Sequence, residues 1–472
     1  MSRVGESLRT RRRLLIGITA ASLGIVCGYD LSNIAGALLF ITNDFNLTVR
    51  KQELLTTIVV IGQICGALSG GFLANAIGRK RSMMLVAGGY AVFSLLGAAA
   101  VSMPWLMTAR MLLGMTIGLS ATVTPVFIAE SAPARLRGSL LVTYQVATIL
   151  GIIGGYLSAF ALADSGSWRW MLGLAAVPAL LVLPLLASTP DTARWYLFKN
   201  RVDDARRSLL RIEPDRDVEQ ELAEIAEAMR EERGGSILEM LRLPYLRATL
   251  FVVGLGFFAE LSGINGIIYY SPLLFQAMGF QGNFSLLVLP ALVQLASLVA
   301  VLTSLVLVDR VGRRPILLCG IATMILGDGV LIAVFAAKSD AVSGFGYAGL
   351  LMFTMGFTFG FGALVWVYAG ESFPAHLRSL GASAMLTANL TANALIESVF
   401  LTMLNNLGGA GMFTVFAVLA SVGFIMVYRF APETKGRQLE DIRHFWENNG
   451  RWPDQTPPDE SSSVPTDVPA CR

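Results

Sequence analysis

The sequence predicts an all-α membrane protein in which twelve transmembrane helices form two pseudo-symmetric six-helix bundles. Hydrophobic residues make up 54% of the 472 residues and charged residues 15%, a balance that a soluble core of this size could not hide. Twelve apolar runs have about the 20 residues that a helix needs to cross a bilayer. Short motifs of the first half return in the same order in the second half. Together these observations favour a duplicated membrane bundle.

Each predicted span is a mostly apolar run between polar segments. The runs are 14–40, 54–77, 82–102, 105–129, 139–163, 168–187, 248–278, 285–308, 315–337, 344–369, 379–407 and 411–431. The first run is too long for a secretory signal and is followed by many others, so we interpret it as a helix. The predicted domains are the N-terminus 1–13, the bundle 14–198, the linker 199–247, the bundle 248–431 and the tail 432–472, whose Pro- and Ser-rich end is expected to be disordered.

Positive charges gather on one side of the predicted spans. They precede the first span and follow the second, fourth, eighth and tenth, as at Arg79, Arg135, Arg313 and Arg378. Cytoplasmic loops of membrane proteins carry an excess of Lys and Arg. We therefore expect a multi-pass protein of the plasma membrane with both termini in the cytoplasm.

The linker between the two bundles is predicted to hold short cytoplasmic helices. Leu222, Ile225 and Met229 recur at helical spacing within an acidic run, which indicates an amphipathic helix. A second short helix is expected over 237–243. We interpret the linker as a bridge without a ligand of its own.

Glycines within two of the predicted spans are spaced along one helical face. Gly62 and Gly66 share a face in the second span, as do Gly114 and Gly118 in the fourth. Small residues let helix backbones approach closely in lipid. The spacing predicts tight helix packing and gives no information about the substrate.

Three motifs occur once in each half. Asn75 to Lys80 returns as Asp309 to Arg314, Glu130 to Arg137 returns as Glu371 to Arg378, and Pro190-Asp191-Thr192 returns as Pro432-Glu433-Thr434. A duplicated membrane chain usually holds its site between the halves, and that is the architecture of a transporter.

The cations of these motifs are predicted to lie at helix ends on the cytoplasmic side. There they can cap helix C-termini and pair with Glu130 and Glu371. We expect the motif residues to hold the two halves together when the cavity is closed to the cytoplasm. The alternative is that the cations only determine the orientation of the chain in the membrane. The residues of this predicted latch are Arg79, Glu130, Arg137, Arg194, Asp309, Arg313, Glu371, Arg378 and Glu433.

Taken together, these motifs resemble the sugar porter family of the major facilitator superfamily, over the chain up to about Arg443. The other matching segments are Gly28-Tyr29-Asp30, Pro190 to Trp195, Leu261 to Asn265 with Tyr269-Tyr270, and Pro432 to Gly436. The resemblance implies the major facilitator fold and a secondary active transporter of the proton-linked symporter type. Such a protein imports a monosaccharide, a hexose, pentose or related polyol, by alternating access. It is expected to work as a monomer, with the proton as coupling ion and no other cofactor.

Proton coupling in this chain has to use carboxylates, because His376 and His444 both lie outside the predicted spans. The acids within the spans are Asp30, Glu260, Asp328 and Glu397, and the clearest basic partner is Arg110. We assign no role to Asp328 or Glu397 from the sequence.

Asp30 and Arg110 are predicted to meet. A rise of about 1.5 Å per residue places Asp30 roughly 15 Å and Arg110 roughly 8 Å from the outer ends of their spans. Breaking such a contact changes the affinity of the aspartate for a proton, which would make a coupling switch. The resemblance agrees, since proton-linked members carry an aspartate and an arginine at these positions. The alternative is a static buried ion pair.

The resemblance also supplies substrate-binding candidates. Amide side chains both donate to and accept from sugar hydroxyls, and an aromatic ring covers the apolar sugar face. The implied positions are Gln145, Asn265, Trp366, Asn389 and Asn393, with Tyr269 and Tyr270 as an outer gate. Without the resemblance, each polar residue would more readily be read as a hydrogen bond between helices.

Some positions depart from the family pattern. Two adjacent glutamines are typical before Asn265, and this chain has Ala259 and Glu260 there. Glu260 could accept sugar hydroxyls, titrate, or suit a polyol or amino sugar, so the sugar remains open. The approach to Trp366 lacks the prolines that are typical of the tenth span.

Other functional classes fit the sequence less well. A facilitative sugar uniporter is the nearest alternative; a non-transporting sugar sensor would need a long signalling tail, and a drug/proton antiporter would not need so many amides. We expect no enzyme, because no nucleophile and base occur together in a motif and no metal-ligand cluster is evident. Nucleic acid is not an expected partner.

Overall fold

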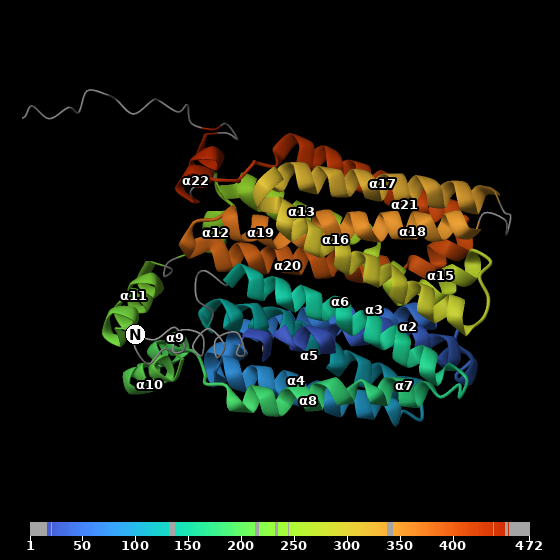
Figure 1. Cartoon of the computed structure of the whole chain (residues 1–472), viewed down its shortest axis with the longest axis horizontal. Helices are drawn as coiled ribbons and strands as arrows, with labels where there is room; N and C mark the ends of the chain where they lie inside the picture. The colour runs from blue at the N-terminus through green and yellow to red at the C-terminus, as the bar shows by residue number, and fades with distance from the viewer. Residues whose placement is uncertain are drawn as a thin grey trace, which may run out of the picture.

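The structure is a computed structural model that describes residues 17–19, 21–131, 137–212, 217–231, 235–243, 245–337, 343–437, 439–448 and 452. The described chain folds into two helical halves that lie against each other (Figure 1). The predictions for residues 1–13, for Arg135 and for the end of the tail fall outside these ranges.

The N-terminal half contains six spans. They are α2 (Leu23–Asp44), α3 (Val49–Ile77), α4 (Arg79–Ala98), α5 (Met103–Ser131), α6 (Arg137–Ala163), and α7 (Trp168–Leu174) continued by α8 (Ala176–Ser188). Within this half α2 packs on α6 and α3 on α5. A Cβ atom on Gly62 would lie 2.2 Å from the Met111 carbonyl oxygen, so the predicted small-residue faces are confirmed as close helix contacts.

The C-terminal half repeats the arrangement with more interruptions. Its elements are α13 (Tyr245–Leu261), α14 (Ile264–Tyr269), α15 (Ser271–Ala277), η1 (Phe284–Val288), α16 (Leu289–Val311), α17 (Arg313–Ala337), α18 (Ser343–Phe357), η3 (Thr358–Gly362), α19 (Ala363–Glu371), α20 (Ala375–Glu397) and α21 (Phe400–Phe430). In this half α13 packs on α20, and α17 packs on α18 and α21. Both η1 and η3 are single π-helical turns at the beginning or within a span.

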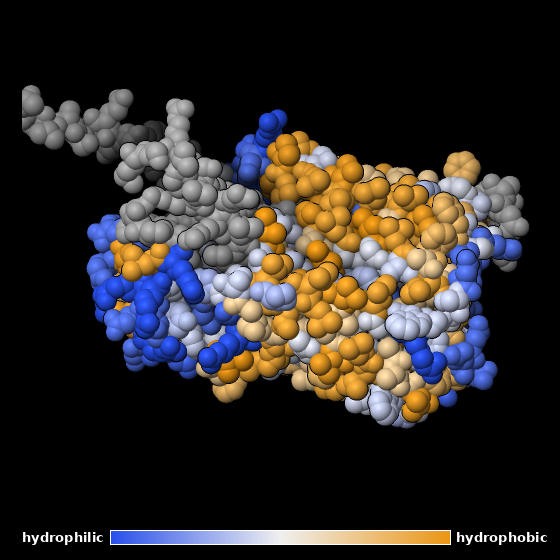
Figure 2. Space-filling view, turned by 60° about the horizontal axis from the view of Figure 1, so that its bottom comes forward, coloured by the Kyte–Doolittle hydropathy of each residue, from blue (hydrophilic) through white to orange (hydrophobic). Residues whose placement is uncertain are grey.

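Within the described ranges, eleven helices are long and apolar enough to cross a membrane. The predicted span that is not among these eleven is 379–407, which corresponds to α20. This helix is 23 residues long and contains several polar residues, among them Asn389 and Asn393. Figure 2 shows apolar side chains over the sides of the bundle and hydrophilic ones at both ends. Large apolar side chains such as Phe72, which is 80% exposed, face outward from the helices. This surface suits the hydrocarbon interior of a bilayer.

The structure corrects the boundaries of two predicted spans. The run 248–278 is not one helix: Gly263 adopts a left-handed conformation with φ of 87° and separates α13 from α14. The run 379–407 ends as a helix at Glu397, and α21 begins at Phe400. Residues up to Leu407 therefore belong to the last span, which bends at Gly408, where φ is 68°.

The linker helices lie at one end of the bundle (Figure 1). They are α9 (Ala193–Phe198), α10 (Val202–Ile212), α11 (Val218–Glu231) and α12 (Ile237–Met240), and α22 (Leu439–Glu447) lies at the same end. The helix predicted around Leu222 is confirmed as α11, and the one predicted over 237–243 is shorter than expected, since α12 ends at Met240. The sequence analysis missed α10, whose apolar residues Ala205 and Leu209 are buried in a small cluster with Leu222.

Candidate functional site

A cavity of about 170 Å³ lies between the two halves. It brings together five of the six predicted substrate-binding residues, each from a different helix: Gln145 of α6, Glu260 of α13, Asn265 of α14, Trp366 of α19 and Asn389 of α20. Trp366 is 48% exposed, so its ring is free to cover a ligand. The sixth residue, Asn393, does not line the cavity; it is 3% exposed, and its amide oxygen has no hydrogen-bond partner among the described residues.

Glu260 organises the amide side chains of this cavity. Its carboxylate accepts a hydrogen bond of 2.8 Å from Asn265 Nδ2 and one of 3.2 Å from Asn389 Nδ2. Asn389 Nδ2 also donates to the Gly256 carbonyl oxygen at 3.2 Å. The two amide oxygens are left to accept hydrogen bonds, so the site offers several acceptors to a hydroxyl-bearing ligand.

The interruption at Gly263 positions two of these residues. Glu260 lies in the last turn of α13, and Asn265 lies in the first turn of α14. The left-handed glycine redirects the chain between them, and a Cβ atom there would lie 2.6 Å from the Phe416 ring. Without the break, the side chains of Glu260 and Asn265, five residues apart, would diverge around the helix.

The sequence analysis missed several polar residues of the cavity. Thr148, Gln294, Thr354 and Thr358 also line it. Thr358 begins the π-helical turn η3, which lies just before α19 and Trp366. The predicted tenth span lacks its usual prolines, but it is still interrupted at this point. The π-helical turn η3 supplies this interruption, and such turns often occur at functional sites.

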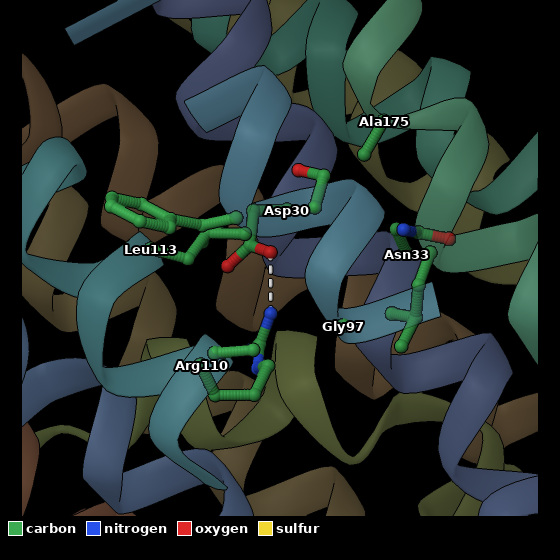
Figure 3. A pocket seen from close by; sticks show the side chains of 10 residues that line it. Asp30, Asn33, Gly97, Arg110, Leu113 and Ala175 are labelled. Carbon is green, nitrogen blue, oxygen red and sulfur yellow. Dashed lines mark hydrogen bonds and ion pairs between the residues drawn. The ribbon is translucent and has the colours of Figure 1, made fainter. Parts of the chain in front are cut away.

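Asp30 and Arg110 form the predicted ion pair. Arg110 Nη1 on α5 lies 2.5 Å from Asp30 Oδ1 on α2, and the two side chains are 1% and 2% exposed (Figure 3). Asn33, Gly97 and Leu113 surround the pair. The next residue after Asp30, Leu31, lines the cavity. The aspartate of the ion pair is therefore the neighbour in sequence of a residue that lines the candidate sugar site.

The two halves are joined at the end of the bundle remote from the linker helices, which we call the distal end. Tyr156 Oη of α6 donates to the Ile268 carbonyl oxygen at 2.6 Å. Glu53 of α3 accepts hydrogen bonds from the backbone N–H and hydroxyl group of Thr402, at 2.7 and 2.9 Å. Thr402 lies in the first turn of α21, so Glu53 caps a helix of the other half. This closure of the distal end was not predicted.

The predicted gate tyrosines belong to this closure. Tyr270 contacts the Thr56 hydroxyl of the other half, donates to the Glu397 carbonyl oxygen at 3.3 Å and stacks on Phe400. Tyr269 is completely buried. Both side chains are therefore placed in the sealed region between the cavity and the distal end.

The predicted latch residues form two clusters at the opposite, basic end. In the first, Arg79 makes two hydrogen bonds of 3.1 Å to Glu130, and Arg194 lies 3.9 Å from the same carboxylate. Backbone N–H groups of Arg79, Lys80 and Thr192 donate to Asp191. Burial raises the pKa of Asp191, and these hydrogen bonds oppose the rise.

The second cluster repeats the first in the C-terminal half. Arg313 lies 3.7 Å from Glu371 and 3.2 Å from Asp309, and its backbone N–H donates to Glu433 at 3.0 Å. Arg378 has a buried Nε that finds no hydrogen-bond partner within the part of the chain that the structure describes. The side chain of Arg137 lies outside the described part of the structure.

The expectation that these clusters hold the halves together concerns the conformation closed to the cytoplasm, and it stays a prediction. The ion pairs of each cluster join helices of one half, because the duplicated motifs are each complete within their own bundle. Asn75 stands where Asp309 stands in the second copy, and its side-chain oxygen accepts from Arg79 at 3.0 Å. The amide thus substitutes for the missing acid.

Comparisons with known proteins agree with this architecture. The family model described as "Sugar (and other) transporter" matches residues 16–446. The galactose-proton symporter of Escherichia coli (strain K12) is 36% identical over 426 residues, which cover 90% of this chain and 92% of that protein. The arabinose-proton symporter of the same strain is 32% identical over 446 residues, which cover 93% and 94%. A solved structure of the proton:xylose symporter XylE shares the fold, with a TM-score of 0.79 at 24% identity, covering 93% of this chain and 100% of that one.

Proposed function

Since the chain belongs to the family of sugar and other transporters, we propose that it imports a monosaccharide together with a proton. The observation that carries this proposal is the buried Asp30–Arg110 pair one residue from a polar cavity between two halves. The similarity to galactose-proton and arabinose-proton symporters supports the same reaction. We expect the ligand to be a hexose, a pentose or a related polyol.

The cavity suits a sugar. Gln145, Asn265 and Asn389 supply amide groups for hydroxyls, and Trp366 supplies a half-exposed aromatic face. Among the described residues that line the cavity, Glu260 is the ionisable one. Because its carboxylate is held by two amides, it orients them as well as accepting from the sugar. These contacts support the five lining residues as the substrate site.

Alternating access follows from the position of the contacts between the halves. The distal end is sealed by Tyr156, Glu53 and Tyr270, each hydrogen-bonded across the interface. The basic end carries the cationic turns and faces the cytoplasm under the positive-inside rule. We therefore interpret the structure as a conformation closed to the outside. Opening of the distal contacts would expose the cavity to the other side of a plasma membrane.

The proton supplies the driving force in this proposal, and no other cofactor is required. Protonation of Asp30 would release Arg110 and change the contacts between α2 and α5, both in the N-terminal half. One proton charge that moves across a potential of 100 mV contributes about 2.3 kcal/mol, which supports roughly 50-fold accumulation. A facilitative uniporter would carry the sugar without this coupling.

Uptake by proteoliposomes tests the proposal. A panel of labelled hexoses, pentoses and polyols is offered to the purified protein with and without an imposed proton gradient. We expect at least one sugar to accumulate above its outside concentration only when the gradient is present. If the sugar equilibrates to the same extent with and without the proton gradient, the protein is a uniporter and not a symporter. The absence of any sugar flux would reject sugar transport.

A further inference from the structure

A second and smaller cavity lies beside the Asp30–Arg110 pair, inside the N-terminal half (Figure 3). We call it the ion-pair cavity, and its volume is about 10 Å³. Its lining comes from α2, α4, α5 and α7, with Ala175 directly after α7, and it shares no residue with the cavity between the halves. Besides the ion pair itself, the polar residues among the described lining are Asn33 and Ser94. The ion pair thus has a polar cavity of its own.

The polar side chains of the ion-pair cavity are buried and incompletely bonded. Asn33 is 1% exposed and Ser94 is 2% exposed. Among the described residues, no hydrogen-bond partner is found for either amide atom of Asn33, the Ser94 hydroxyl, Asp30 Oδ2, or Arg110 Nε and Nη2. A buried polar group without a partner usually costs about 1–3 kcal/mol, and more if it is charged. These atoms therefore need hydrogen bonds that the neighbouring side chains do not supply.

A water molecule fits this cavity by size and by chemistry. A cavity of roughly 10–15 Å³ is large enough for one water, which typically makes about three hydrogen bonds when it is buried. The amide of Asn33, the hydroxyl of Ser94 and the carboxylate of Asp30 offer both donors and acceptors. Apolar cavities stay dry, whereas polar ones of this kind hold ordered water. The ion-pair cavity is therefore suited to an ordered water beside the carboxylate.

The polar residues of the ion-pair cavity lie on the distal side of Asp30. Helix α2 runs toward the distal end, and Asn33 lies three residues beyond Asp30, which is about 4.5 Å along the helix. Helix α4 begins at Arg79 in the basic cluster, so its last turn, which contains Gly97, is distal. Ser94 comes just before this turn. A water held by Asn33 and Ser94 would thus lie between the carboxylate and the outer side.

We propose, resting on the proposed proton symport, that Asn33 and Ser94 are positioning residues that hold a water beside Asp30, and that the coupled proton reaches Asp30 through this water from the distal side. The water donates a proton to the Asp30 carboxylate and takes another from water on the distal side. The net result is one outside proton bound to Asp30, and Arg110 loses its ionised partner. The proton enters through the N-terminal half, while the sugar enters between the halves.

Gly97 provides a way to narrow this route without disturbing the packing. A Cβ atom built on Gly97 would lie 3.9 Å from Ala109 Cβ and 3.9 Å from Leu172 Cδ1, which are ordinary van der Waals contacts. All three residues line the ion-pair cavity. Gly97→Ala therefore adds a methyl group beside the cavity and displaces no neighbour. Gly88 is the matched control on the same helix, because nothing lies within 4 Å of a Cβ atom built there.

Two substitutions of equal shape test the role of Asn33 in proteoliposomes. Valine and threonine differ at one position, where threonine carries a hydroxyl group that can bind water. We expect Asn33→Val to lower the rate of proton-driven uptake at least about tenfold relative to counterflow exchange, as for the loss of one hydrogen bond. Counterflow and its KM should be retained, as the sign of a folded protein with an intact sugar site. Asn33→Thr should restore most of the wild-type ratio of the two rates.

Ser94→Ala and Gly97→Ala give independent tests at smaller side chains. Both are expected to lower the ratio of proton-driven uptake to counterflow, and Gly88→Ala is expected to leave it unchanged. A wild-type ratio in Asn33→Val, or equal loss in Asn33→Val and Asn33→Thr, would overturn the role of Asn33. Equal ratios in Gly97→Ala and Gly88→Ala would overturn the route. Loss of counterflow in step with uptake would mean that these residues serve the fold and not the proton.

An experimental structure at high resolution gives a readout that does not depend on transport. We expect a water within hydrogen-bond distance of both Asn33 and Ser94 in the wild type, and none there in Asn33→Val. A dry ion-pair cavity in the wild type would overturn the proposal. A wild type that holds this water but shows no proton-driven uptake would instead reject the proposed symport.

Discussion

Asp30→Asn separates the coupling of transport from sugar binding. The substitution keeps the size of the side chain and one acceptor oxygen for Arg110, so no cavity is created. It removes the negative charge from a pair whose members are 1% and 2% exposed and whose atoms are 2.5 Å apart. Breaking a buried pair by removing one charge costs about 3–5 kcal/mol when nothing replaces it.

The expected loss can be calculated for a defined driving force. At a membrane potential of about 100 mV, one proton supports roughly 50-fold accumulation of sugar, because 2.3 kcal/mol is about 1.7 decades. An asparagine at position 30 cannot carry the proton, so the accumulation ratio should fall to about 1. Sugar exchange does not need a net proton movement and should persist.

The assay compares two fluxes in the same proteoliposomes. Uphill accumulation of labelled sugar under an imposed potential measures coupling, and counterflow without a gradient measures binding and alternation. Asp328→Asn serves as the control for loss of a buried carboxylate outside the site. Accumulation in Asp30→Asn at the wild-type ratio would refute the assignment of Asp30 as the coupling residue.

Three further substitutions test the site, the distal closure and the packing. Glu260→Ala removes the acceptor that holds the side chains of Asn265 and Asn389. We expect the KM for sugar counterflow to rise at least tenfold, which corresponds to a loss of about 1.4 kcal/mol in binding free energy. An unchanged KM would contradict the role of Glu260. Glu53→Ala removes one of the contacts between the halves at the distal end, so chemical labelling of that end from outside should become faster in intact cells. Equal labelling rates would argue against the closure. Gly28→Val places a Cβ atom 1.9 Å from the Thr148 carbonyl oxygen, and it should abolish the folded monodisperse protein in size-exclusion chromatography; normal elution would mean that α2 and α6 are less close than described.

The sequence predicted the bundle and the ion pair because both depend on local, repetitive information. Apolar run length and the side of the positive charges define spans and orientation. Once the orientation is known, counting along two helices places Asp30 and Arg110 at comparable depth. Their contact at 2.5 Å therefore confirms a prediction that needed no knowledge of the packing.

The contacts between the halves could not be predicted in this way. Glu53 and Thr402 are 349 residues apart, and their hydrogen bonds exist only because the distal end is closed in this conformation. Whether the latch pairs cross between the bundles could not be predicted for the same reason, since a motif shows which residues form pairs but not which bundles those pairs join.

The breaks within spans also escaped the sequence analysis. Gly263 separates two helices because of its left-handed conformation, but many glycines elsewhere in the chain continue a helix. No proline or polar cluster within the π-helical turn that begins at Thr358 indicates the turn from the sequence. Such irregularities follow from tertiary packing, and in this protein they position Glu260, Asn265 and Trp366 around the cavity.

The change in external pH when sugar is added to proteoliposomes tests the central claim most directly. No potential or pH gradient is imposed, so sugar that moves inward down its own gradient must draw protons with it. The wild type is expected to make the medium more alkaline in proportion to the sugar that enters, and Asp30→Asn is expected to take up sugar without any change in pH. Sugar entry without alkalinisation in the wild type, or equal alkalinisation in both proteins, would contradict proton-coupled import through the Asp30–Arg110 pair.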